Sequence, residues 1–214
     1  MPYKKYIQAI SEMNNLISSS TEDEIKRYSE SDIYWVRNKS VTDKKVKYHK
    51  GDVCQFEFGK NYIPEMSYEH RGLIIGVNNK LLYVLPICSK RSSNSYHLGA
   101  YHPIDNPTSS DYYLLKNSEY PFLKHDSILK LNDLRTVSIA RSKYKQGSIN
   151  LNSKTFIEIE EMTFSKHFPT YSYKYNKLAD DYNMLLLENQ ELMKALDEYK
   201  KTLDEVASAN QTLE

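Results

Sequence analysis

The chain has 214 residues, 40% of them apolar and 27% charged, which is the composition of a globular protein with one domain of ordinary size and extensions. No run approaches the roughly 18 apolar residues that a membrane span needs, and Met1 to Lys5 lacks the apolar core of a signal peptide, so we expect a cytoplasmic protein with no membrane partner. The net charge of +1 divides into +5 for residues 1–170 and −4 for residues 171–214, a surplus too small to identify a nucleic-acid-binding protein.

Residues 1–45 are predicted to form a helical extension. Apolar side chains recur there at three- and four-residue spacing, at Tyr6, Ile7, Ile10, Met13 and Ile17. Thr21 followed by three acids predicts the start of a second helix, whose apolar side would carry Ile25, Tyr28, Ile33 and Trp35. We expect a helical hairpin packed on the next domain. A recognition role for Trp35 is the alternative.

Residues 46–170 change to short strands broken by turn residues. Cys54, Phe56 and Phe58 alternate with polar residues, and two continuous apolar runs, Leu73 to Val77 and Leu81 to Ile87, flank a hairpin turn at Asn78-Asn79. Further strands are expected at Tyr113 to Lys116 and at Ile128 to Val137. Asn152-Ser153 should then cap a helix that carries Phe156, Ile159 and Met162.

The only two cysteines, Cys54 and Cys88, lie inside strand-like runs rather than in a close-spaced pair. We therefore expect reduced, buried thiols, with neither a disulfide framework nor a metal site. Between the strands, residues 88–112 form a polar, turn-rich loop of the kind that often holds a substrate.

Residues 171–214 have the periodicity of a coiled coil. Two interleaved series repeat every seven residues: Leu178, Leu185, Leu192, Tyr199, Val206 and Leu213 at the d positions, and Tyr182, Asn189, Leu196, Leu203 and Asn210 at the a positions. Leucine mainly at d and asparagine at a favour a parallel homodimer, because an asparagine in the seam finds its partner across an in-register pair. Folding back on its own domain, or pairing with a different helical protein, is the alternative.

Several short motifs occur in a fixed order within residues 48–168. They are Gly51-Asp52-Val53, Glu65, His70-Arg71, Pro86-Ile87-Cys88-Ser89 and Leu134-Arg135-Thr136-Val137. Together they resemble the MazF/PemK family of endoribonuclease toxins. The resemblance implies an α+β protein in which a small SH3-like β-barrel is flanked by the N-terminal helices and the C-terminal coiled coil. It also implies metal-independent cleavage of single-stranded RNA without a cofactor, an antitoxin protein as partner, and a homodimer through the barrel, the coiled coil or both.

The resemblance also assigns roles to residues. The family's catalytic arginine, five residues after the glutamate, aligns with His70, which matches a histidine-bearing variant, and Arg71 stands where the family has proline. The family's threonine aligns with Cys88 and the following hydroxyl with Ser89. The implied catalytic residues are His70, Arg71 and Ser89. The implied RNA-binding residues are Glu65, Lys90, Arg91, Arg135, Thr136 and Arg141.

Departures from the pattern leave alternatives. Cys88 fits a buried apolar position better than an active thiol. Asp133 replaces a frequent glutamine, and an acid near a phosphate path is unfavourable unless Arg135 pairs with it. Arginines and a histidine at strand ends are commonly ordinary surface residues. The second hypothesis is therefore a catalytically degenerate RNA- or protein-binding module, and the third is an adaptor that works through its coiled coil.

Overall fold

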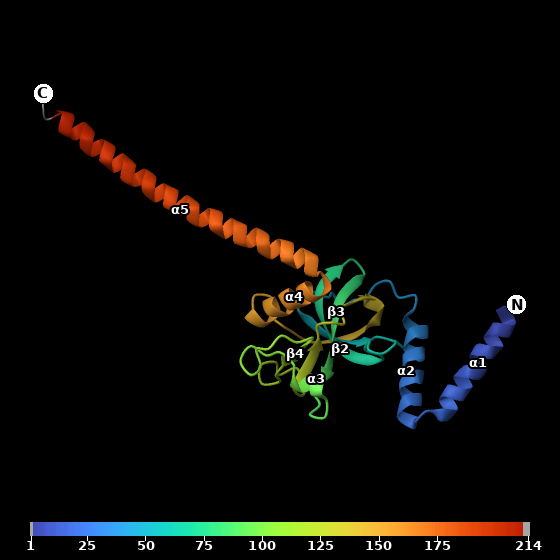
Figure 1. Ribbon diagram of the computed structural model, residues 1–214. Coiled ribbons are helices and arrows are strands. Elements are labelled where there is room, and N and C mark those ends of the chain that lie inside the picture. Colours follow the sequence, from blue (N-terminus) through green and yellow to red (C-terminus); the bar gives the residue numbers. More distant parts are fainter. Residues whose placement is uncertain (1, 212–214) are drawn as a thin grey trace. The chain divides into compact units, whose positions relative to one another are not determined.

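The computed structural model describes residues 2–211, and Figure 1 shows their helices and strands. The chain divides into two units, Met1–His167 and Phe168–Glu214, which are described separately below. The predicted domain boundaries at residues 46 and 171 stay predictions.

The first unit contains an antiparallel sheet of seven strands. They are β1 (Asp52–Glu57), β2 (Glu69–Asn78), β3 (Leu81–Ser89), β4 (Tyr112–Leu115), β5 (Ser127–Lys130), β6 (Arg135–Ser138) and β7 (Ser142–Ser148). The order is β4-β5-β3-β2-β1-β7, and β6 pairs with β3 beside this path. The fold is α+β, as expected.

The strand pairing shows that the expected closed barrel is wrong. β3 is long enough to pair with β6 along its first four residues and with β5 along its last three. β6 therefore branches from the middle of the sheet, and the 3-10 helix η1 (Ile139–Arg141) leads the chain to β7 at the far edge. Among the described strands β4 and β7 remain the two ends of the sheet, so it is not closed.

Both faces of the central strands are buried. Val53, Leu73 and Leu85 belong to one core, which α4 (Lys154–His167) covers with Phe156 and Ile159. The residues that alternate with them, Cys54, Ile74 and Val84, belong to a second core with Phe56, Phe58, Leu82, Val137 and Ile139. Burial on both sides explains why the sequences of β2 and β3 contain continuous apolar runs. Ser153 caps α4 as predicted, since its hydroxyl accepts the Phe156 N–H.

The predicted helices of the N-terminal extension are α1 (Pro2–Ser19) and α2 (Glu22–Asn38). Thr21 is the N-cap of α2, and with Glu24 it completes a capping box. The expected apolar packing holds only in part, since Ile25 and Tyr28 are half-buried. Within α2 only Ser31 is buried, and its hydroxyl donates to the buried Glu57 carboxylate at 3.0 Å. The Tyr34 hydroxyl lies 2.9 Å from the carbonyl oxygens of Ala140 and Ser142.

The side chains expected to pack the helical extension are exposed instead. On α1 these are Tyr6, Ile7, Ile10, Met13 and Ile17, and on α2 they include Ile33 and Trp35. Lys39 lies over the Trp35 ring, with its ammonium 5.1 Å from the ring centre. α2 is thus attached to the sheet domain by the hydrogen bonds of Ser31 and Tyr34 as well as by the Tyr28 ring, and the apolar periodicity did not indicate the polar contacts.

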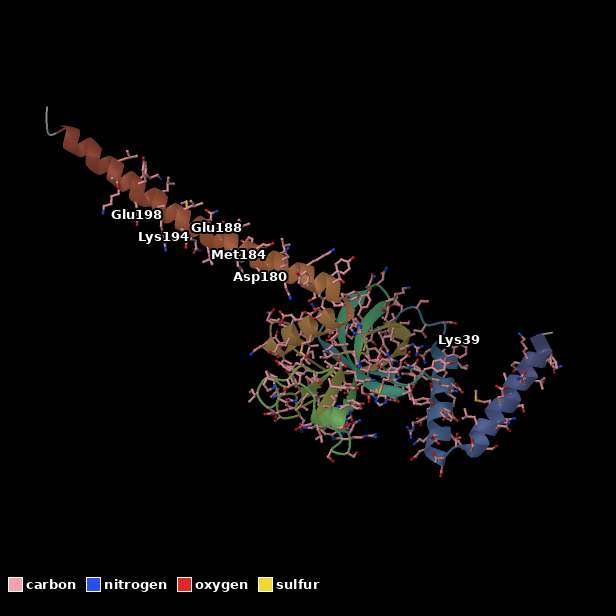
Figure 2. The ribbon with its side chains drawn as sticks, in the orientation of Figure 1. Lys39, Asp180, Met184, Glu188, Lys194 and Glu198 are labelled. Carbon is pink, nitrogen blue, oxygen red and sulfur yellow. The ribbon has the colours of Figure 1, made fainter. Side chains whose placement is uncertain are left out.

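The second unit is one continuous helix, α5 (Pro169–Gln211), of 43 residues. Figure 2 labels Asp180, Met184 and Glu188, which follow one another along it at four-residue spacing. The apolar heptad residues up to Leu203 are exposed, with Leu178, Leu185 and Leu192 each more than 60% exposed. Leu213 and the side chains of Val206 and Asn210 lie outside the described residues. Pairing through this seam stays a prediction. No helix in the described part of the chain is both long and apolar enough to cross a membrane.

Candidate functional site

A hollow of about 480 Å³ lies where β2 and β3 meet the loop after β3. Its lining brings together four of the predicted site residues, and in full it consists of Gln55, Met66, Glu69, His70, Arg71, Ile87, Cys88, Ser89, Arg91, Asn94 and His97. Strand pairing sets the arrangement, because Arg71 of β2 lies opposite Ile87 of β3, two residues before Ser89. The short helix α3 (Ser95–Leu98) supplies His97.

Arg71 is a partly buried cation in the wall of this hollow. Its Nη2 lies 3.4 Å from Ser89 Oγ, and it forms no ion pair with any carboxylate among residues 3–203. Burial lowers the pKa of its guanidinium, and so disfavours the charged form. A desolvated arginine without a carboxylate gains most from an anionic ligand, and its fork of N–H donors matches a phosphate group.

His70 lines the same hollow from the other side of β2. Burial lowers the pKa of its imidazole, and the charges of Arg71, Arg91, Lys130 and Arg27 lower it further. The ring is therefore neutral near pH 7 and can accept a proton there. Alternation along β2 turns neighbouring side chains to opposite faces, yet the hollow includes both His70 and Arg71 because it wraps the end of the strand.

Cys88 and His97 form a contact that sequence reasoning missed. His97 is 8% exposed, its Nε2 lies 3.6 Å from Cys88 Sγ, and its Nδ1 accepts the Arg91 backbone N–H at 3.1 Å. Since Nδ1 is an acceptor, the proton of the neutral ring is on Nε2, which faces the sulfur. Burial raises the pKa of the Cys88 thiol and lowers that of His97. A thiolate–imidazolium pair is thus disfavoured, and His97 instead fixes the backbone of Arg91.

The remaining predicted RNA-binding residues lie elsewhere. Glu65, Arg135, Thr136 and Arg141 line a separate hollow of about 390 Å³. Arg135 bonds both oxygens of Asp133, at 2.7 and 2.9 Å, and also donates to the Met66 carbonyl. Arg141 donates to the Glu57 carbonyl at 3.1 Å.

These contacts already occupy the two guanidinium groups. Arg135 pairs with Asp133, which is the condition expected from the sequence for an acid near a phosphate path, so the negative charge of Asp133 is neutralised. Lys90 is exposed and donates its backbone N–H to the Asp126 carbonyl. Contact of these residues with RNA stays a prediction. Within the described residues, no group of three His, Cys, Asp or Glu side chains is placed to hold a metal ion.

Comparison with known proteins gives likenesses to solved structures but none in sequence. No protein-family model matches this chain, and no curated protein matches it in sequence. Among solved structures, it is similar to a chain described as an endoribonuclease in complex with its cognate antitoxin, from a mycobacterial species. The two are 9% identical, and the match covers 56% of this chain and 92% of the other, with a TM-score of 0.35. At this TM-score the likeness carries no inference about the activity or partners of the present chain.

Proposed function

We propose that this chain is the toxin of a toxin–antitoxin pair, an endoribonuclease of MazF/PemK type that cleaves single-stranded RNA with its own side chains. The observation that carries the proposal is the first hollow: a partly buried Arg71, which pairs with no carboxylate among residues 3–203, lies beside the Ser89 hydroxyl and a neutral His70. These are a phosphate-binding cation, a hydrogen-bond donor and a proton acceptor. RNA cleavage needs this set, because its nucleophile is the ribose 2′-hydroxyl of the substrate itself.

The proposed reaction is a transesterification. His70 takes the proton from the 2′-hydroxyl, the 2′-oxygen bonds to phosphorus, and the bond from phosphorus to the 5′-oxygen breaks. The charge that develops on the phosphoryl oxygens is stabilised by Arg71 and Arg91, with a hydrogen bond from Ser89. The proton held by His70 passes to the leaving 5′-oxygen. The products are a 2′,3′-cyclic phosphate and a 5′-hydroxyl, and the imidazole returns to its neutral form.

Three substitutions within the hollow test the roles. His70→Ala removes the proton acceptor and should slow cleavage about 10²-fold or more. Ser89→Ala should have an intermediate effect. Cys88→Ala is the matched control, because the thiol lines the same hollow but is neutral and faces His97. Full loss in Cys88→Ala together with wild-type rates in His70→Ala would invert the assignment.

A binding module without catalysis is the second candidate. It is favoured by the departures at His70 and Cys88 from the family pattern, and by the engagement of Arg135 and Arg141 within the chain. Retention of RNA without cleavage would select it. In either case we propose a homodimer through the sheet domain, through α5 or through both, and an antitoxin that uses the acidic flank of α5.

A further inference from the structure

Another hollow, called the second hollow below, adjoins the hollow of Arg71 and shares His70 with it. It measures about 400 Å³ and is lined by Arg27, Glu30, Glu57, Glu65, Ser67, Tyr68, Glu69 and His70. Glu69 and His70 belong to the walls of both hollows. Arg27 and Glu30 come from α2, so the N-terminal extension supplies part of the surface next to the candidate catalytic histidine.

Arg27 is the cation of this second hollow. Its Nε donates to the Asp23 carbonyl at 3.3 Å, within the helix, and no ion pair joins it to a carboxylate among residues 3–203. Its charge is one of those that lower the pKa of His70. Among residues 3–203, Arg27, Arg71 and Arg91 form no ion pair with a carboxylate, and each lines a hollow whose wall includes His70.

The carboxylates of the second hollow are largely engaged. Lys143 pairs with Glu69, and its ammonium lies 4.0 Å from Glu57. Glu57 also accepts hydrogen bonds from the Ser31 hydroxyl and the Gly59 N–H, and Glu65 lies 3.9 Å from Arg135. Glu57 and Glu69 share the single ammonium of Lys143, and Glu30 forms no ion pair among residues 3–203, so the hollow keeps acidic charge. The guanidinium of Arg27 also forms no ion pair within these residues and is available to an anionic ligand.

Tyr68 gives the second hollow an aromatic wall. It is held in the left-handed region, with φ 63°, a conformation that is unfavourable for a non-glycine residue and persists only where the surroundings impose it. Two backbone hydrogen bonds impose it here: the Tyr68 N–H donates to Gly59 and its carbonyl accepts from Phe58. The ring centre lies 5.7 Å from that of Tyr28 on α2. Aromatic rings beside cations are the surfaces on which single-stranded bases stack.

We infer that α2 forms one wall of the substrate groove, so that an RNA strand passes from Arg71 and Arg91 across His70 to Arg27, which binds a second phosphate, and to Tyr68, which stacks a neighbouring base. The inference rests on the proposed function for its ligand. It makes the N-terminal extension a determinant of how strongly long substrates bind.

The test is the salt dependence of binding to a 2′-O-methyl RNA oligonucleotide, which lacks the nucleophilic hydroxyl and cannot be cleaved. Each phosphate contact on a single strand contributes about 0.7 to the slope of log K against log salt. Arg27→Gln should lower the slope by about that amount and weaken binding at low salt. Lys26→Gln is the matched control, because it removes the same charge from the adjacent exposed position, which lines neither hollow.

Equal slopes and affinities for the Arg27 and Lys26 variants would overturn the inference, and so would failure of the wild type to bind the oligonucleotide. Tyr68→Leu should weaken binding without changing the slope, because stacking involves no counterion release. A wild type that binds but leaves all-ribose RNA intact, together with a reduced slope in Arg27→Gln, would refute the nuclease and keep the groove. A wild type that cleaves RNA, together with Arg27 and Lys26 variants that behave alike, would support the nuclease and refute the groove.

Discussion

Replacement of Arg71 by methionine should separate function from stability. The change keeps most of the aliphatic stem and removes a charge that burial already disfavours. What is lost inside the protein is one long contact to Ser89, at 3.4 Å, and no ion pair with the described residues. A hydrogen bond from a charged group contributes about 1.5–3 kcal/mol at ordinary length, but this contact is long and the desolvation of the charge opposes it, so the free energy of unfolding should change by no more than about 1 kcal/mol in either direction.

Activity should respond far more strongly. Removing a preorganised donor from a developing oxyanion costs about 10²–10³ in rate, or about 3–4 kcal/mol. Arg71→Lys should recover only part of the rate, since an ammonium keeps the charge but loses the planar fork. The assay is kcat/KM on a fluorogenic RNA beside thermal unfolding, where 1 kcal/mol corresponds to about 2–4 °C for a chain of this size. A fall in Tm above about 10 °C, with activity lost in proportion to the unfolded fraction, would show that Arg71 is structural.

Four further predictions concern His70, the core under α4 and the helix α5. Because neighbouring cations lower the pKa of His70, Arg91→Gln should shift the acid limb of the kcat/KM profile to higher pH. An unchanged acid limb would show that the charge of Arg91 does not act on His70. The lowered pKa also means that the unfolded chain binds more protons than the folded chain. The contribution of neutral His70 to the free energy of unfolding is therefore complete above about pH 6.5 and is lost as the pH falls through the folded-state pKa. His70→Gln should flatten this dependence in urea unfolding measured from pH 7 to pH 4.5, whereas equal slopes for both proteins would contradict it. Phe156→Ala removes a fully buried ring that joins α4 to the sheet and should cost about 3–5 kcal/mol in urea unfolding; a cost under 1 kcal/mol would mean that α4 does not cover the core. A peptide of residues 171–214 should sediment as a helical dimer, and Asn189→Leu should stabilise it while broadening its oligomeric states; a peptide that stays monomeric and unfolded at high micromolar concentration would favour a different partner helix.

Local signals in the sequence predicted what local physics controls. The hydroxyl cap of α2, the β2–β3 hairpin turn and the Ser153 cap each depend on a few adjacent residues. Both caps occur where expected, and the turn is at Asn79-Lys80, one residue later than predicted. Asn79 takes the left-handed conformation that a tight turn requires, with φ 58°. The 43-residue helix α5 likewise follows from a long periodic pattern.

Features that depend on tertiary contacts were not predicted from the sequence. β7 was not predicted, because its sequence, with Lys143 and Lys145, is that of a polar edge strand without apolar alternation. The apolar spacing in α1 and α2 predicted packing, but α2 is held by Ser31 and Tyr34 through hydrogen bonds that have no period.

The candidate site shows the same limit. The family resemblance assigned His70, Arg71 and Ser89 to one site, and they line one hollow. A lone histidine in a polar loop gave no sign that His97 would reach Cys88, nor did charge alone indicate that Arg27 lies beside His70, more than 40 positions later.

The most direct test of the central claim is the chemistry of the RNA ends. Purified wild-type protein and His70→Ala are incubated with a long single-stranded RNA in EDTA, and the fragments are examined for phosphorylation by polynucleotide kinase and for cyclic phosphate by mass spectrometry. The wild type should yield 5′-hydroxyl ends and 2′,3′-cyclic phosphates, while His70→Ala should leave the RNA largely intact. Intact RNA with the wild type, or fragments with 5′-phosphates, would contradict the proposed function.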